Sequence, residues 1–347
     1  MMAVQSVLEV KNGDTLGAVR GVLKMLLEKN LVDALLVPLQ VPGADRITPT
    51  LVKETQQLDV ANPLAPVMRL NAAAMLVRLQ KEDQTTRIGA VLRPCELRAV
   101  VELAKFGHIA LDRVTFVGID CMGTYEPETY ARIARASTRE ESPTDEMLRW
   151  TRQGPIAPYR LRGACQMCEY FSMENADLAI GLVGMNVRER LLIEARDDIA
   201  EKLNLRAGGA NGRAKAIARL SAIRKSRREQ AMANAAEMLK DVPSLLGVIA
   251  LCTACGECQD VCPFCGTDAF VPKPARAEHP GEGVPFGELV RWARRAASCV
   301  QCGMCELACP CHVPLTAIQA VLGRALQQQY DYVPGRDAEE KLPWATA

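Results

Sequence analysis

The chain has few aromatic residues, almost no net charge and no long hydrophobic run, and each shortage excludes a class of protein. Aromatic residues make up 4% of the 347 residues, which argues against a surface that stacks nucleic-acid bases. Lys and Arg number 42 and Asp and Glu 41, so the net charge of +1 gives no general attraction to nucleic acid or membrane. No apolar run approaches the roughly 18 residues that a membrane span requires. The composition predicts an ordinary soluble globular protein.

Cysteine, by contrast, is abundant, with 14 residues. The first residues lack the charged and apolar regions of a secretory signal, so we expect a cytoplasmic protein. In a reducing cytosol this many cysteines indicate metal or redox sites rather than disulfides. The length exceeds that of one average domain, and we expect two or three domains.

Two copies of one cysteine motif lie between residues 245 and 325. Both fit C-x2-C-x2-C-x3-C-P, the spacing of ferredoxins that hold two [4Fe–4S] clusters. A tight loop presents three thiolates to one cluster, and Gly256 and Gly303 let its backbone N–H groups turn toward the sulfides. The fourth cysteine of each run normally binds the other cluster. The predicted ligands are Cys252, Cys255, Cys258 and Cys309 for cluster 1, and Cys299, Cys302, Cys305 and Cys262 for cluster 2.

The two copies are separated by 36 residues that include a helical pattern at 286–298. This spacing favours a mostly α-helical dicluster domain over a compact β-type ferredoxin. Cys265 and Cys311 stand outside the eight ligands, and we interpret them as small buried side chains, with a ligand role as the alternative. His312 is expected near the second cluster without being a ligand.

Strand and helix patterns alternate over the first 120 residues. Such alternation predicts an α/β domain with a parallel sheet, whose ligands gather beyond the carboxyl ends of the strands. Residues 121–160 read as an excursion, and 176–204 return to a strand, a turn and a helix. The predicted helices are 16–30, 70–82 and 95–107, and the predicted strands are 32–39, 87–92 and 113–120.

A long amphipathic helix is predicted at 213–240, after a glycine-rich linker. From Arg213 to Arg228 it carries seven Lys or Arg residues and no acid. A solvated helix face is the favoured interpretation, and a docking surface for an acidic partner or a cofactor phosphate is the alternative. The resulting division is an α/β domain at 1–205, a basic helical connector at 206–240, a dicluster domain at 241–325 and a tail at 326–347.

Four cysteines remain in the first half. Cys95 and Cys121 each follow a predicted strand, so both thiols are expected at the carboxyl edge of the sheet. Helix N-termini at that edge lower thiol pKa values and favour an anionic cluster. The Cys165-x-x-Cys168 pair would complete four ligands. The residues alone leave three possibilities open: a third iron–sulfur cluster, a zinc site, or a redox dithiol or unrelated structural thiols.

Three segments of this half, "LRPCELRAVVEL", "FVGIDCMG" and "RGACQMCEYFSMENADLAIGLVG", resemble the beta-subunit family of coenzyme F420-reducing hydrogenases and F420-dependent formate dehydrogenases. The resemblance covers roughly residues 10–200. It implies FAD, and passage of electrons between a soluble carrier and a partner subunit. It also implies a third [4Fe–4S] cluster held by Cys95, Cys121, Cys165 and Cys168.

The resemblance further implies flavin contacts in two segments. One is "ADLAIGLVG", which contains Asp177, Gly181 and Gly184. The other lies near the N-terminus, where Asn12, Gly13 and Asp14 replace the family's usual Ser-Gly-Gly. The family's Ser-Lys-Tyr segment before the middle helix is replaced by "RLNAAAML". These departures weaken what the resemblance implies about the identity of the carrier and the presence of the flavin.

The leading hypothesis is an electron-transfer subunit of a larger oxidoreductase. Electrons would pass between a soluble carrier (deazaflavin, NAD(P)H or ferredoxin), FAD, three [4Fe–4S] clusters and a catalytic partner of the formate dehydrogenase, hydrogenase or heterodisulfide-reductase type. The alternative is a flavin-free iron–sulfur connector that joins two redox enzymes. A redox-sensing regulator is disfavoured because no DNA-binding helix pair is evident.

Overall fold

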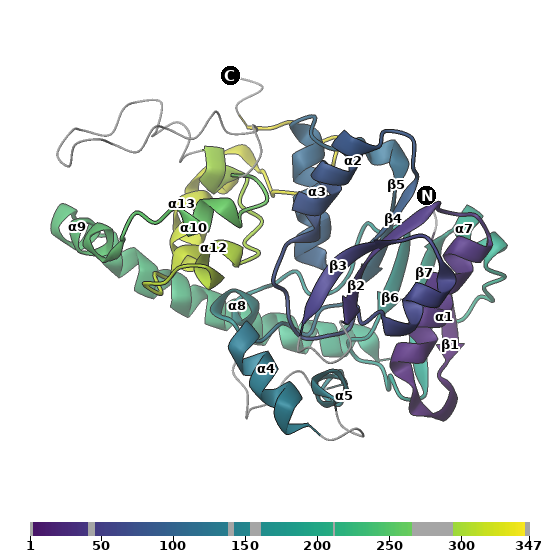
Figure 1. The fold of residues 1–347 in the computed structure, drawn as a ribbon. Coiled ribbons are helices and arrows are strands. Elements are labelled where there is room, and N and C mark those ends of the chain that lie inside the picture. Colours follow the sequence, from purple (N-terminus) through teal and green to yellow (C-terminus); the bar gives the residue numbers. More distant parts are fainter. Residues whose placement is uncertain are drawn as a thin grey trace.

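A seven-stranded sheet forms the centre of the computed structural model, which describes residues 3–40, 46–137, 142–152, 161–210, 212–265 and 294–343 (Figure 1). The strand order is β1-β7-β6-β5-β4-β2-β3. The strands are β1 (Ala3–Glu9), β2 (Ala34–Gln40), β3 (Ile47–Val52), β4 (Ile88–Leu92), β5 (Val114–Ile119), β6 (Leu178–Gly181) and β7 (Arg190–Arg196).

The four strands β2, β4, β5 and β6 are parallel, which confirms the predicted α/β class. The edges differ from the prediction of a wholly parallel sheet, because β3 pairs antiparallel with β2, and β7 pairs antiparallel with both β6 and β1. Short connections explain why β3 follows β2 and β7 follows β6 in this way. A parallel pair needs a crossover of a dozen or more residues, whereas a short connection allows only an antiparallel neighbour.

Helices cover both faces of the sheet, and alternate residues of each strand face opposite layers. On β2, Leu35 and Val37 pack with helix α1 (Thr15–Glu28), while Leu36 packs with α2 (Ala72–Glu82) and α3 (Pro94–Lys105). Helices α1, α2 and α3 correspond to the three helices predicted from the sequence. Their apolar faces bury the sheet and leave its carboxyl edge to carry the site.

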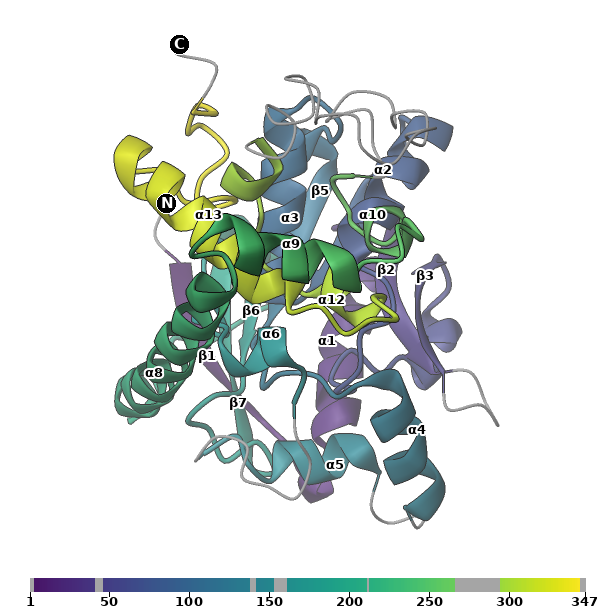
Figure 2. The same cartoon turned by 90° about the vertical axis from the view of Figure 1, so that its left-hand side faces the viewer.

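The segment after β6 differs from the sequence prediction. Residues 190–196 form strand β7 instead of a helix, and only the short α7 (Asp197–Lys202) is helical. The apolar run Leu191–Ile193 is buried between two neighbouring strands, and this tertiary pairing outweighs the local helical pattern. The excursion at 121–160 contains α4 (Pro127–Ala136) and α5 (Pro143–Leu148), which lie together at one end of the molecule (Figure 2).

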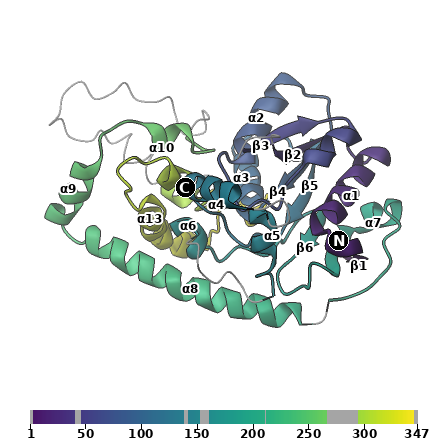
Figure 3. The same ribbon diagram turned by 60° about the horizontal axis from the view of Figure 1, so that its bottom comes forward.

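The predicted basic helix is present as α8 (Arg213–Met238), which runs from the sheet to the ferredoxin loops (Figure 3). The linker before it is partly structured, because Gly208 N–H donates to the carbonyl of Gln5 in β1 at 2.9 Å. Beyond α8 come α9 (Val242–Leu251), α10 (Glu257–Asp260), α12 (Met304–Leu307) and α13 (Leu315–Tyr330). Most of the helix predicted at 286–298 lies outside the described residues, and 294–297 are helical.

Helix α13 packs along the second half of α8. The apolar residues Met232 and Ala235 of α8 are buried against Ala317 and Ala320 of α13. An ion pair joins the same two helices, so α8 connects the sheet to the dicluster region through a continuous packed interface. In the part of the chain that the structure describes, no helix has the length and apolar character needed to cross a membrane.

The C-terminal residues 331–340 fold back onto α3, and we call this segment the C-terminal clasp. The Tyr332 hydroxyl donates to the buried carboxylate of Glu102 at 2.5 Å, and Gly335 N–H donates to the same group at 2.9 Å. The Arg98 guanidinium donates to the carbonyl of Pro334 at 2.7 Å. Gly335 has φ +70°, and a Cβ there would lie 2.6 Å from Arg98 Cα, so only glycine fits. The clasp fastens the dicluster region to the sheet domain a second time.

Candidate iron–sulfur sites

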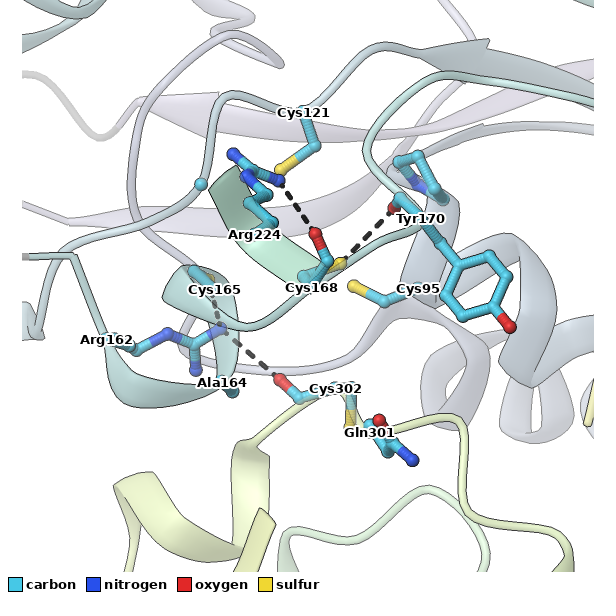
Figure 4. A pocket seen from close by; sticks show the side chains of 12 residues that line it. Cys95, Cys121, Arg162, Ala164, Cys165, Cys168, Tyr170, Arg224, Gln301 and Cys302 are labelled. Atoms are coloured by element: carbon cyan, nitrogen blue, oxygen red, sulfur yellow. Dashed lines mark hydrogen bonds between the residues drawn. The ribbon is translucent and has the colours of Figure 1, made fainter. Parts of the chain in front are cut away.

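Four cysteines from three segments line one small cavity at the carboxyl edge of the sheet (Figure 4). No three His, Cys, Asp or Glu side chains in the described ranges meet closely enough to hold a single ion. The thiols instead surround a space, which is the arrangement that a [4Fe–4S] cluster requires, because each iron takes its own thiolate. The residues fit the third cluster predicted above. The four cysteines are Cys95, Cys121, Cys165 and Cys168.

Local structure explains how two of these cysteines reach the cavity. Cys95 lies in the first turn of α3, directly after β4, where Pro94 begins the helix and the Glu96 carboxylate accepts the Arg93 N–H at 3.0 Å. Cys121 follows β5, and its N–H donates to the carbonyl of Phe171 at 2.8 Å. The predicted position at the ends of neighbouring parallel strands is therefore the position observed.

The Cys-x-x-Cys segment reaches the same edge through hydrogen bonds to the loop after β5. Arg162 N–H donates to the carbonyl of Thr124 at 3.0 Å, just before the short helix α6 (Gly163–Gln166). Cys165 lies in this helix, and Thr124 contacts its Sγ through both the backbone N–H, at 3.4 Å, and the hydroxyl, at 3.3 Å. Tertiary hydrogen bonds, rather than a local motif, therefore bring Cys165 and Cys168 to cysteines that are distant in the sequence.

The four thiols differ in their electrostatic surroundings. Burial raises the pKa of Cys95 well above its ordinary value and raises that of Cys121 to about 11. Burial also raises the pKa of Cys168, with the Arg224 charge opposing it. For Cys165 burial acts in the same sense, but the Arg162 charge and the Thr124 hydrogen bonds outweigh it and lower the pKa. Cys165 is the thiol best prepared to bind as a thiolate.

A buried ion pair lies directly beneath this edge. Asp120, the residue before Cys121, accepts the Arg213 guanidinium at 2.6 Å. It also accepts N–H donations from Met173 at 2.9 Å, Leu182 at 2.8 Å and Val183 at 2.9 Å. One carboxylate therefore joins the β5 loop, the β6 loop and the start of α8.

Helix α8 supplies positive charge to the site, and the sequence pattern does not by itself identify which side chains do so. Arg224 donates to the carbonyls of Cys168 at 3.3 Å and Met122 at 2.9 Å. Arg228 pairs with Glu169 at 3.1 Å, beside the same loop. The remaining basic residues of the run are exposed, as expected for a solvated face: Lys215, Arg219, Lys225 and Arg227. The helical spacing of Arg213, Arg224 and Arg228 is the signal that could have identified the inward face.

The thiols of Cys258 and Cys305 each interact with the other cysteines of their predicted ligand set. Burial raises the pKa of Cys258, and the thiols of Cys252, Cys255 and Cys309 raise it further. Burial raises the pKa of Cys305 well above its ordinary value, and its neighbouring thiols contribute as well: Cys299, Cys262 and Cys302. Each group contains three cysteines of one loop and the fourth cysteine of the other, as crossed ligation requires. Ligation itself stays a prediction.

The third set of cysteines, namely Cys95, Cys121, Cys165 and Cys168, lies directly against the loop that carries the cysteines of cluster 2. Cys302 lines the same cavity as the four cysteines of the third set. Gly303, at φ +72°, turns the loop so closely over α6 that an added Cβ would overlap the methyl group of Ala164. The third set and the cluster 2 set are therefore adjacent. The most exposed cysteines lie in the cluster 1 loop, where Cys252 and Cys255 are exposed. The other cysteines of the chain are half-buried.

The residues predicted to contact the flavin around β6 are Asp177, Gly181 and Gly184, and all three contact other parts of the protein. The Asp177 carboxylate accepts Phe116 N–H at 2.7 Å and pairs with Arg196 at 2.6 Å. A Cβ on Gly181 would lie 3.1 Å from the Arg213 guanidinium, and one on Gly184 would lie 2.9 Å from Arg213 Cα. Helix α8 thus covers both glycines.

The predicted N-terminal flavin loop lies beyond β7, two strands from β6. Asn12 and Gly13 are exposed in a short 3-10 turn (Lys11–Gly13) with positive φ. The Asp14 side chain accepts Gly17 N–H at 2.7 Å and caps α1. The structure therefore does not gather these residues with Gly181 and Gly184 around one described pocket, and their role stays a prediction.

Two cysteines and one histidine remain around the clusters. The Cys265 thiol interacts with Cys262, and this hydrogen bond lowers the pKa of Cys262 to about 7. Cys311 is half-buried, with its Sγ 4.0 Å from the Thr253 hydroxyl. His312 follows it with φ +51° and is exposed. The structure shows these residues beside the loops without assigning a ligand role to any of them.

Fold and cysteine sets together define an iron–sulfur electron-transfer protein. Residues 85–210, which contain all four cysteines of the third set, match the family model for the C terminus of the beta subunit of coenzyme F420 hydrogenase/dehydrogenase. Residues 248–313, which contain both ferredoxin loops, match the model "4Fe-4S dicluster domain". The chain is therefore similar to the C-terminal domain of F420 hydrogenase/dehydrogenase beta subunits over residues 85–210 and to a 4Fe-4S dicluster domain over residues 248–313, and the resemblance seen in the sequence is confirmed.

Several relatives resemble much or part of the chain. The F420-dependent formate dehydrogenase subunit beta of Methanocaldococcus jannaschii is 26% identical over 360 residues, which cover 92% of this chain and 92% of the relative. The F420-dependent formate dehydrogenase 1 subunit beta of Methanococcus maripaludis is 28% identical over 196 residues, 51% of this chain and 49% of the relative. A chain of the F420-reducing [NiFe] hydrogenase complex from Methanosarcina barkeri aligns at 12% identity and a TM-score of 0.47, covering 67% of this chain and 92% of that chain.

Proposed function

We propose that this protein is a cytoplasmic electron-transfer subunit of an oxidoreductase complex, with three [4Fe–4S] clusters in one line. The observation that carries the proposal is the shared cavity, in which Cys302 of the cluster 2 set lies with Cys95, Cys121, Cys165 and Cys168. Adjacent clusters exchange single electrons, so three adjacent sites make a conducting path. The names of the relatives support a place within a formate dehydrogenase or hydrogenase complex.

The chain's own contribution is to hold the clusters and set their charge environment. Thiol burial, hydrogen bonds to sulfur and nearby arginines are the properties through which a protein sets cluster potentials. Around the third set these are Thr124, Arg162 and Arg224. Side-chain acid–base chemistry is not needed for electron transfer, and we assign no catalytic residue.

FAD would supply the conversion between a two-electron carrier and single electrons. A cavity of about 260 Å³ borders the third set, sharing Pro94 and Tyr170 with its lining. The Arg98 guanidinium stacks on the Tyr170 ring at 3.7 Å, and Arg336 of the clasp lies on the same wall. Since helix α8 covers Gly181 and Gly184, we propose this cavity as the place for the flavin ring. The soluble carrier that fits the relatives' names is the deazaflavin F420, with NAD(P)H or ferredoxin as the other candidates.

A catalytic partner subunit would exchange electrons at the opposite end. Cys252 and Cys255 are exposed there, and electrons leave most readily where a cluster lies near the surface. Helix α9 leads into this loop and exposes Val242, Leu246 and Leu251 to 68%, 57% and 52%. An exposed apolar helix beside an exposed cluster loop is the kind of surface that another protein covers in a complex.

The alternative is a flavin-free connector between two redox enzymes. The observation that favours it is the engagement of the predicted flavin residues, since Asp177 pairs with Arg196 and α8 covers both glycines. In that case the cavity beside Tyr170 would be a surface for a second protein carrier.

Acid release of flavin and iron analysis on the anaerobically purified full chain distinguish these functions. The proposal predicts FAD near one equivalent and about 12 irons per chain, since three clusters hold four irons each. Absence of flavin with about 12 irons would favour the connector. About eight irons would refute the third cluster and with it the continuous path.

A further inference from the structure

One buried arginine contacts both the third set of cysteines and the cluster 2 loop. Arg162 is 4% exposed, and its guanidinium reaches Cys165 Sγ at 3.7 Å and the Cys302 carbonyl at 3.4 Å through the same nitrogen. Its Nε donates to the Thr124 hydroxyl at 2.7 Å, and its other terminal nitrogen lies 3.9 Å from the Met304 sulfur. Figure 4 shows the side chain between α6 and the Cys302 loop.

In the described part of the chain no carboxylate lies within ion-pair distance of Arg162, and Glu126 feels its charge only from farther away. Burying a charged group without a counter-charge is strongly unfavourable, so native proteins pair such groups. The guanidinium contacts the Cys165 thiol and the Cys302 carbonyl, and both residues belong to predicted cluster ligand sets. Their thiolates, and the anionic clusters they would bind, supply the missing negative charge.

The geometry points to Arg162 as a positioning residue shared by two clusters, which it holds together and whose reduced forms it stabilises. This inference rests on the proposed function, because it requires the third cluster to be present. A positive charge close to a cluster favours the state that has gained an electron, by Coulomb attraction that is strong inside a protein. One arginine between two clusters therefore raises the potentials of both and changes the difference between them little.

Arg224 provides a matched comparison. It is also buried, at 3% exposed, and it donates to the Cys168 carbonyl and to Met122, both in the sheet domain. Among the described residues, its side chain makes no hydrogen bond to the ferredoxin loops. Arg224 therefore acts mainly on the third cluster, while Arg219 on the same helix is exposed and does not line the cavity of the third set.

The test is an anaerobic redox titration of the full chain, followed by electron paramagnetic resonance, for Arg162→Gln, Arg224→Gln and Arg219→Gln. Signals of the third cluster are assigned by their loss in Cys165→Ser. We expect Arg162→Gln to lower the equilibrium constant for reduction of the third cluster and of cluster 2, each about tenfold, which is about 59 mV for one electron. Arg224→Gln should lower it for the third cluster only, and Arg219→Gln for neither.

An Arg162→Gln protein with full iron content and both potentials unchanged, or with only one shifted, overturns the inference. Should that variant lose iron, Arg162→Lys decides, because it keeps the charge but gives up the further guanidinium nitrogens that contact Thr124 and Met304. We expect it to retain iron and to show smaller shifts of both clusters in the same direction. A shift of one cluster or of none contradicts the inference. About eight irons in the unmodified protein would instead show that the proposed function has failed.

Discussion

The two kinds of cysteine site in this chain are built in opposite ways. Each ferredoxin loop supplies three thiols from a stretch of seven residues, shaped by a glycine at positive φ, Gly256 in one loop and Gly303 in the other. The third set draws its thiols from three segments that meet only through the sheet and its hydrogen bonds. Local geometry creates the first kind, and tertiary structure creates the second. They should therefore respond differently to substitution.

The largest effect is expected from removing a thiol of the third set. Cys165→Ser should reduce the iron content by about four per chain, because one cluster loses a ligand while the loops keep theirs. Iron analysis of the anaerobic protein measures this. Cys311→Ser, outside all predicted ligand sets, is the control and should keep its iron. Unchanged iron in Cys165→Ser would contradict the ligand assignment.

The next largest effect concerns the tertiary support of the third set. Asp120→Asn leaves the buried Arg213 guanidinium without its counter-charge, and we expect a loss of about 3–5 kcal/mol in the free energy of unfolding. Urea denaturation measures this loss. Electron paramagnetic resonance should show the third cluster weakened before the two ferredoxin clusters. The exposed Asp59, paired with Lys24, is the control, and Asp59→Asn should leave the stability unchanged. Equal losses in both variants would refute this account.

A smaller difference should separate the two loop glycines. Both Gly256→Ala and Gly303→Ala force a side chain into positive φ, at a cost of roughly 1–2 kcal/mol. A Cβ at Gly256 meets nothing within 4 Å, whereas one at Gly303 overlaps Ala164 of α6, which adds about 1–3 kcal/mol. Thermal unfolding midpoints under anaerobic conditions should fall further for Gly303→Ala. Equal midpoints would show that the loop and α6 do not press together.

The smallest effect is expected at the C-terminal clasp. Burial and the Glu102 carboxylate raise the pKa of Tyr332 above its ordinary value. Because the pKa is raised in the folded state, the hydrogen bond of the Tyr332 hydroxyl stabilises the protein fully below about pH 10, where the tyrosine of the unfolded chain is also protonated. This stabilisation is lost as the pH rises above about 10. Tyr332→Phe should cost about 1.5 kcal/mol at neutral pH. Urea denaturation at about pH 7 and about pH 10.5 should show this difference narrowing at the higher pH. A constant difference would exclude the tyrosine proton as its cause.

The parts of the fold and the site that the sequence predicts are those formed by local structure, and the parts it misses depend on tertiary contacts. The ferredoxin loops, α1, α2, α3 and the central parallel strands are predictable because their signals are contiguous and periodic. The helix predicted in place of strand β7 is wrong, because pairing with β1 and β6 outweighs a local pattern that suits either structure. Topology alone places Cys95 and Cys121 at one edge.

The arginines around the third set have no comparable signal. Arg162 and Arg224 are two among 42 basic residues, and only the folded chain shows that they face thiols and carbonyls rather than water. The covering of Gly181 and Gly184 by α8 is equally hidden, since it depends on where the chain places the first turn of that helix, around Arg213. Tertiary contacts of this kind are what one sequence cannot supply.

The C-terminal clasp also sets an order of events during synthesis of the protein. Arg98 meets Pro334 across 236 residues, and Lys105 meets Glu340 across 235. These contacts can form only after the segment that carries Pro334 and Glu340 has left the ribosome. Until then the cavity edge beside Tyr170 has no Arg336 on its wall, and the cluster 2 loop is joined to the sheet only through its own packing and α8. The clasp therefore completes the wall of this cavity only after the sheet domain and α13 have been synthesised.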